Sequence, residues 1–349
     1  MPPFPEIRSE HFLPAMKLGI EEHRRDIEAI AQRKDPPTFA NTIEALDAAG
    51  ALLERVSAVF FNLNSAETNG VLQAAAKETA PLLAALRDDI ALNEALFARV
   101  KAVWERRAKL KLSRDQLRLT EETYKNFVRG GANLNADQKR RLRAVNERLS
   151  VLSVQFGENL LKETNSYRLV IGQQADLAGL PETAVSAAAE AAKRAGLEGK
   201  WVFTLHAPSI QPFLAYASNR ELRRQIFTAY VERCADGPAG NRAIAAQIAA
   251  LRAERARLLG YQTHAHLVLE ERMAKEPDKV YALLRQLWAP ATRVARAEAA
   301  DLQAAIRKEG HTFKLEPWDW MYYAEKVKRA RYDFDENAVR EYFPLEAVR

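Results

Sequence analysis

Apolar residues recur every three or four positions along most of this chain, which is the spacing that one face of an α-helix requires. The longest such series consists of Leu142, Val145, Leu149, Leu152, Phe156 and Leu160. Gly130 and Gly131 can end the preceding helix, and Asn135 and Gln138 have the spacing of a capping box. The pattern therefore predicts a long amphipathic helix after Asn135, as one arm of a helical hairpin.

Prolines predict where regular structure is interrupted. Residues 1–16 hold four prolines and are expected to form an extended arm that leads into a helix. A loop with two adjacent prolines precedes Phe39, Ile43 and Leu46, which are spaced as one helical face requires. Pro81 lies in a further helical stretch, where it predicts either a first turn or a break.

Helical patterns resume in the last third of the chain. Residues 218–221 read Ser-Asn-Arg-Glu, which predicts a capping box at the start of a helix. A second stripe consists of Ile244, Ile248, Leu251 and Leu258. Arg255 interrupts this stripe, where its aliphatic stem could still cover apolar surface, and Gly260 is placed as a C-cap. Residues 276–310 predict one or two more helices.

Strand signals are confined to two short segments, 166–172 and 199–207, which flank an alanine-rich helical stretch at 182–196. The predicted fold class is therefore all-α, with a possible small two-stranded β element near 166–207. The expected organisation is a helical region at 1–165, a β-containing insert at 166–207 and a second helical region at 208–349.

Composition fits a globular helical protein. Glycine and proline are scarce, at 14 and 15 of 349 residues, and the net charge is +6. The one cysteine, Cys234, excludes an intrachain disulfide framework. The first residues lack the basic flank and apolar stretch of a signal peptide, and no apolar run is long enough to span a membrane. We expect a cytoplasmic protein, with the periplasm possible if a signal sequence was removed.

The candidate chemistry is sparse. A helical zinc-peptidase motif needs two histidines at i and i+4, and no two of the six histidines have that spacing. His266 and Glu270 could share one helical face, but no third ligand is evident, so a surface or capping role is favoured. Cys234 is interpreted as a buried or idle thiol. No sequence motif of a serine nucleophile, a phosphate loop or a dinucleotide site is present.

Basic and aromatic clusters allow a nucleic-acid hypothesis. Residues 104–125 and 137–148 are rich in lysine and arginine, but acidic residues interleave them, which is typical of solvated helix faces. Eight of the last 34 residues are Trp, Tyr or Phe. Trp318, Trp320 and the pair Tyr322 and Tyr323 could stack on bases, although core contacts are favoured for so apolar a segment.

Several segments together resemble the thimet oligopeptidase family of zinc metallopeptidases. The segments PPTFANTIEALD (36–47), NFVRGGANLNADQKRRL (126–142) and LHAPSIQPFLAYASNRELRRQIFTAYVER (205–233) are each similar to family segments, in order. The ending PWDWMYYAEKVKRARYDFDENAVREYFPLEAVR (317–349) looks like the bacterial peptidyl-dipeptidase, or dipeptidyl carboxypeptidase, branch. The resemblance runs from about residue 4 to residue 349.

This resemblance implies a helical lobe of a two-lobed channel peptidase of roughly twice this length. In the family, a second half carries H-E-x-x-H and a downstream Glu, which bind one zinc. Because none of these falls on this chain, the resemblance implies no catalytic, cofactor-binding or metal-binding residue here, with zinc expected only in the full-length enzyme. The implied partners are short unfolded peptides and the missing carboxy-terminal half, with no nucleic acid and no membrane. The fragment is expected to be inactive alone and to self-associate through an apolar patch near its aromatic-rich end.

Two alternatives remain beside this hypothesis. One is a non-catalytic helical protein that binds peptides without cutting them, and the other is a basic helical nucleic-acid binder. Within the peptidase hypothesis, dipeptide release from peptide C-termini and internal cleavage of short peptides both remain open.

Overall fold

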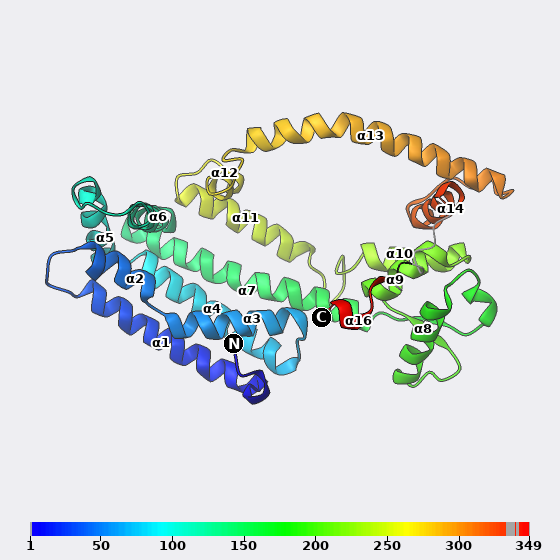
Figure 1. The fold of residues 1–349 in the computed structure, drawn as a ribbon, viewed down its shortest axis with the longest axis horizontal. Helices are drawn as coiled ribbons and strands as arrows, with labels where there is room; N and C mark the ends of the chain where they lie inside the picture. Colours follow the sequence, from blue (N-terminus) through cyan, green and yellow to red (C-terminus); the bar gives the residue numbers. More distant parts are fainter. Residues whose placement is uncertain (1, 333–338, 340–341, 349) are drawn as a thin grey trace. The chain divides into compact units, whose positions relative to one another are not determined.

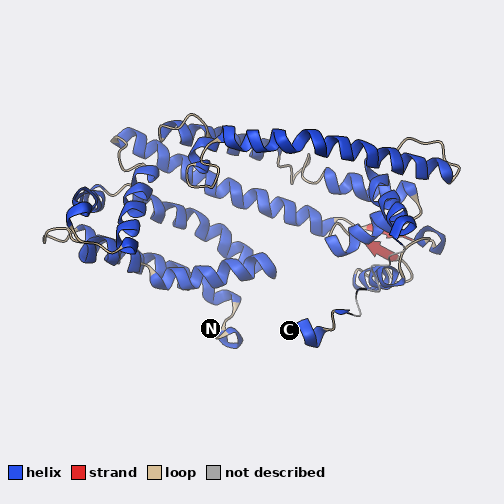
Figure 2. Cartoon of the chain, turned by 45° about the horizontal axis from the view of Figure 1, so that its top comes forward, coloured by secondary structure: helices blue, strands red, loops and turns tan. Residues whose placement is uncertain are grey.

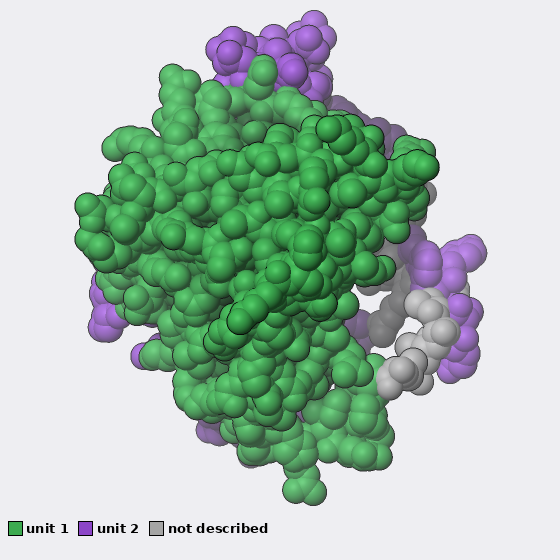
Figure 3. All heavy atoms as spheres, turned by 90° about the vertical axis from the view of Figure 1, so that its left-hand side faces the viewer, with its two compact units in different colours: residues 1–158, 242–277 green, residues 159–241, 278–349 purple. Residues whose placement is uncertain are grey.

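The fold is almost entirely helical (Figures 1 and 2), as expected from the sequence. The structure is a computed structural model that describes residues 2–332, 339 and 342–348. The chain divides into two compact units, coloured separately in Figure 3. The first comprises residues 1–158 and 242–277, and the second comprises residues 159–241 and 278–349. The predicted divisions at 165 and 207 stay a prediction.

Every regular element in the described residues of the first unit is a helix. Its helices are α1 (Phe12–Ala31), α2 (Ala45–Ala48), α3 (Ala51–Ala66), α4 (Gly70–Ala91), α5 (Glu94–Arg106), α6 (Arg114–Gly130), most of α7 (Ala136–Ser166), α11 (Arg242–Leu258) and α12 (His264–Leu269). A π-helical turn, Phe39–Glu44, precedes α2.

Two apolar clusters hold the first unit together. One joins α1, α3 and α4 around Met16 and Phe60, both of which are fully buried. The other joins α1, α5 and α6 around Leu96. Helices α1 and α3 approach so closely that a Cβ at Gly19 would lie 2.9 Å from the Cα of Leu53. This contact requires glycine at position 19, because any side chain there would separate the two helices.

The long helix α7 confirms the strongest sequence signal. Asn135 and Gln138 form the predicted reciprocal capping bonds, and Gly131 ends α6 in the left-handed conformation at φ 101°. Polar contacts then hold α7 against α4, since Asn146 Nδ2 donates to Asp88 Oδ1 at 2.7 Å. Asp88 lies in the candidate site described below.

The second unit contains a two-stranded sheet inside the two predicted segments. Strands β1 (Leu169–Ile171) and β2 (Trp201–Phe203) pair antiparallel, with Leu169 opposite Phe203. Helices α8 (Glu182–Arg194), α9 (Ala207–Tyr216) and α10 (Arg220–Val231) share one apolar cluster with these strands. The remaining elements are the 3₁₀ turns Gln174–Leu177 and Pro317–Asp319, and the helices α13 (Pro277–Lys308), α14 (Trp320–Tyr332) and α16 (Leu345–Val348).

Three local predictions need correction. Residues 1–16 do not form an extended arm, because two 3₁₀ turns precede α1, which starts at Phe12. Pro14 lies in the first turn of α1, where its missing N–H needs no partner.

Pro81 neither starts nor breaks a helix, since α4 runs through it. Because proline has no N–H, the carbonyl of Lys77 lacks its helical partner, and Lys77 is exposed, so this carbonyl can bind water. Asn219, not Ser218, caps α10 by accepting from two backbone amides.

The aromatic-rich segment begins as part of the second unit's core. Tyr323 is 2% exposed and packs with Leu302 and Ile306 of α13, whereas Trp318 and Tyr322 are half-buried and Trp320 is exposed. Core packing is therefore confirmed for Tyr323 and does not hold for Trp320. Of the eight aromatic residues in this segment, Phe334 lies outside the described residues.

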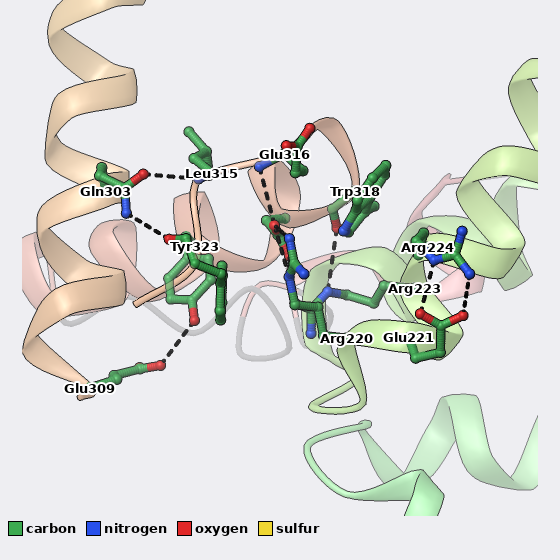
Figure 4. A network of polar contacts seen from close by, with 12 residues as sticks. Arg220, Glu221, Arg223, Arg224, Gln303, Glu309, Leu315, Glu316, Trp318 and Tyr323 are labelled. Atoms are coloured by element: carbon green, nitrogen blue, oxygen red, sulfur yellow. Dashed lines mark hydrogen bonds and ion pairs between the residues drawn. The ribbon is translucent and has the colours of Figure 1, made fainter. Parts of the chain in front are cut away.

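The buried carboxylate of Asp319 joins this segment to α10 through Arg220 and Arg223, both of which are labelled in Figure 4. The side chain of Asp319 has no exposed surface and accepts hydrogen bonds from Arg220 at 2.8 Å and from Arg223 at 3.0 Å. Arg223 is itself buried, and it also donates to the backbone oxygens of Ala217 at 2.7 Å and Trp318 at 3.3 Å. Since each charge is paired and hydrogen-bonded, the network is stable only when it is complete.

Replacing Asp319 with asparagine should destabilise the second unit by about 3–5 kcal/mol, because Arg223 would remain as a buried charge without its counter-ion. Urea unfolding followed by tryptophan fluorescence can measure this, since four of the five tryptophans lie in the second unit. Glu221→Gln is the matched control: it removes an exposed ion pair with Arg224 and should change the unfolding midpoint little. Equal shifts for the two variants would contradict this assignment.

Candidate functional site

The first unit contains an arginine-lined cavity of about 300 Å³. Its lining includes four arginines and, among the described residues, a single carboxylate, Asp88. The arginines are Arg87 of α4, Arg129 of α6, and Arg252 and Arg255 of α11. A wider cavity of about 600 Å³ adjoins it, because Arg87, Arg129, Arg255 and His264 line both.

The arrangement follows from helical periodicity. Arg252 and Arg255 are three residues apart on α11, which places both on one face of that helix. Polar contacts hold this helix near α7, since Arg141 Nη2 donates to Glu254 Oε2 at 2.8 Å. The arginine face of α11 thereby lines the same cavity as Arg87 of α4.

Arg129 is neutralised by its own partners. It forms an ion pair with Glu270, and its Nη2 donates to the backbone oxygen of Leu267 at 2.8 Å. The hydroxyl of Tyr261 donates to the same Glu270 carboxylate at 2.5 Å. Arg129 therefore links α12 to α6, and the carboxylate of Glu270 largely neutralises its charge.

The charge of Arg255, in contrast, has no carboxylate paired with it among the described residues. Its Nε is fully buried and has no hydrogen-bond partner within the part of the chain that the structure describes. Burial lowers the pKa of Arg255, and the nearby charge of Arg87 lowers it further, while Asp88 acts in the opposite direction. Burial in turn raises the pKa of Asp88. The stem of Arg255 was expected to cover apolar surface, but its charged end lies at a cavity.

His264, His266 and Glu270 do not come together as metal ligands. Glu270 is bound by Arg129 and Tyr261, while His266 Nδ1 lies 2.8 Å from the hydroxyl of Thr263, the residue that caps α12. His264 lines both cavities with a buried Nδ1 that has no partner among the described residues. Burial lowers the pKa of His264, as do Arg252 and Arg255, so the imidazole is neutral near pH 7.

The other candidate groups have structural surroundings. Cys234 is buried, and burial together with Glu163 raises the pKa of its thiol, which disfavours the reactive thiolate. The basic segments carry mixed ion pairs such as Arg118 with Glu122, as the solvated-face interpretation predicts. In the described residues, no three His, Cys, Asp or Glu side chains are grouped to hold a metal ion, and no helix is long and apolar enough to cross a bilayer.

Comparisons with known proteins place this chain beside one group of peptidases. Residues 213–349 match the family described as Peptidase family M3. The chain is 39% identical over 348 residues to the dipeptidyl carboxypeptidase of Escherichia coli K12, a match that covers 99% of this chain and 51% of that protein. It is 33% identical to the oligopeptidase A of Haemophilus influenzae, covering 100% of this chain and 52% of that relative. The chain thus spans about half the length of the curated relatives it matches, and the resemblance predicted from the sequence is confirmed.

Sequence reasoning missed the arginine-lined cavity. Arg87 and Arg252 are far apart in sequence, and no spacing rule connects residues on different helices. The interruption of an apolar stripe at Arg255 was the available signal, because a charge on the buried face of a helix needs an explanation.

The first unit should lose stability as the pH falls below about 6.5, the ordinary pKa of histidine. His264 resists protonation when folded because its pKa is lowered, whereas the unfolded chain binds the proton readily. Its contribution is therefore complete above that pH and is lost as the pH falls toward the lower folded pKa. His23, whose pKa burial also lowers, adds in the same direction.

Melting temperatures measured by circular dichroism at pH 7.5, 6 and 5 test this expectation. His264→Gln should show a smaller drop in melting temperature than the unmodified chain over this range. His206→Gln, which changes an exposed histidine, should follow the unmodified chain. The same drop in all three proteins would be evidence against a role for His264.

Proposed function

We propose that this chain is the amino-terminal half of a zinc metallopeptidase of the M3 type that hydrolyses short peptides and releases dipeptides from their C-termini. One observation carries the proposal: similarity covers 99% of this chain but only 51% of the dipeptidyl carboxypeptidase of Escherichia coli K12. Dipeptide release is favoured over internal cleavage because that relative is 39% identical, against 33% for the oligopeptidase A of Haemophilus influenzae. The cytoplasmic location expected from the sequence is part of this proposal.

In this proposal the chain shapes a substrate channel and does not bind the metal. No two of its histidines are four residues apart, so no helix here can offer the two imidazoles of the expected zinc motif. Zinc supplied by the other half would polarise the scissile carbonyl and activate a water molecule. The residues of this chain do not fit that metal, and they are assigned no step of bond cleavage.

An exposed apolar face on α13 supports the proposal that a further segment of the polypeptide packs against this helix. The carboxy-terminal part of this helix is buried at Leu302 and Ile306. The first half instead exposes Tyr281, Leu284 and Trp288, with exposed fractions of 56%, 51% and 75%. These three positions lie on one helical face, and large apolar faces of this kind mark interaction sites.

We assign this face to the carboxy-terminal half of the longer polypeptide. The relatives are about twice as long as this chain, which supplies an occupant within the same protein. Apolar side chains at Tyr342 and Phe343 are exposed as well, close to where the additional polypeptide would continue. The apolar patch expected near the aromatic-rich end is therefore proposed to extend to α13.

The chain alone should hold no stoichiometric zinc and should not cleave peptides. Metal analysis by mass spectrometry and assays with blocked and free-carboxylate peptides can establish this. Co-expression with a carboxy-terminal half taken from a full-length relative should give a complex that binds one zinc and releases dipeptides. One tightly held zinc in the isolated chain, with cleavage abolished by a chelator, would refute the proposal.

Trp288→Glu should reduce both apolar-dye binding and self-association of the isolated chain, because it places a charge on the exposed apolar face. Gln286→Glu adds the same charge on the opposite side of α13 and should change neither property. Sedimentation velocity and dye fluorescence provide the readouts. A monomeric, dye-negative starting chain would show that this face needs no partner.

A further inference from the structure

The arginine-lined cavity has an excess of positive charge that the first unit does not neutralise. Arg87, Arg252 and Arg255 all line it; Arg87 and Arg252 are exposed, and the Nε of Arg255 is buried without a hydrogen-bond partner among the described residues. The opposing carboxylate, Asp88, is engaged by Asn146. Arg129 adds a further positive group at the wall, although Glu270 pairs with it.

The buried end of Arg255 is unfavourable in these surroundings unless an anion compensates its charge. Like charges repel more strongly where burial reduces the screening by water, and a buried guanidinium N–H without a partner loses its hydration without compensation. Exposed arginines on a helix avoid this cost by pointing into solvent. Arg255 does not, since its Nε is fully buried.

We propose that this cavity binds a small oxyanion carrying two or more negative charges, held by Arg87, Arg252 and Arg255. Guanidinium groups bind the oxygens of phosphates and carboxylates through paired N–H donors, which makes this ligand chemistry a better match than halide ions. The hydroxyls of Ser150 and Ser153 also line the cavity and are neutral donors for the same oxygens.

The cavity also has the size and composition for this class of ligand. Its volume of about 300 Å³ suits an inorganic phosphate or a small di- or tricarboxylate with accompanying water. Phosphate and carboxylate are two sources of the same chemistry, and binding tests can separate them. The inference rests only on the first unit, so it does not depend on the proposed peptidase function.

Isothermal titration calorimetry with inorganic phosphate and, separately, with citrate tests the proposal at a constant ionic strength set by sodium chloride. We expect saturable binding of at least one of the two anions to the chain. Arg255→Met keeps an unbranched stem but removes the charge, and it should weaken binding at least tenfold. Arg25→Gln changes an exposed arginine of α1 in the same unit and should bind as the unmodified chain does.

Thermal melting separates a binding role from a structural one. In buffer without multivalent anions, Arg255→Met should melt at a higher temperature than the unmodified chain, because it removes an uncompensated charge. Phosphate or citrate should raise the melting temperature of the unmodified chain and of Arg25→Gln, and should not raise that of Arg255→Met. Arg87→Gln should repeat the weakened binding.

Two results would overturn the proposal. One is the absence of saturable binding of both anions beyond the ionic-strength control. The other is equal anion response in the unmodified chain and in Arg255→Met. Binding of citrate alone would assign the site to carboxylates, and binding of phosphate alone would assign it to phosphates.

Discussion

The second unit depends on the neutralisation of one buried carboxylate. Asp319 has no exposed side-chain surface, so it can remain ionised only where cations reach it, and Arg220 and Arg223 supply them. These arginines are three residues apart on α10, so both side chains lie on one face of the helix and reach the carboxylate of Asp319. The turn that holds Asp319 must therefore sit beside α10, and this fixes where α14 begins. The position of the aromatic-rich segment is thus a consequence of charge compensation as much as of apolar packing.

The first unit contains the opposite case. Arg223 is buried with a full set of partners, whereas Arg255 is partly buried with none among the described residues. Both residues lie on helices, α10 and α11, and the sequence does not show which of the two finds partners in the fold. The contrast between a complete network and an incomplete one indicates which arginine stabilises the fold and which is available to a ligand.

Local signals predicted much of the fold. Capping residues at Asn135 and Gln138 and the strand segments around Leu169 and Phe203 were predictable because these interactions join residues near in sequence, or follow a simple period. The course of α4 through Pro81 was not, since it depends on the packing of the whole helix. The candidate site was not predictable either, because Arg87 and Arg255 meet only through the tertiary arrangement of α4 and α11. The family resemblance came from segments spread along the chain and supplied the functional hypothesis that spacing rules alone could not.

The surroundings of Cys234 have a practical consequence for spectroscopy. It is the one thiol of the chain and it is buried, with a pKa raised by burial and by Glu163. Maleimide reagents react with thiolates, so a cysteine introduced on the surface would be modified far faster than the native one at neutral pH. Fluorophores or spin labels can accordingly be attached at chosen positions in either unit without first removing Cys234.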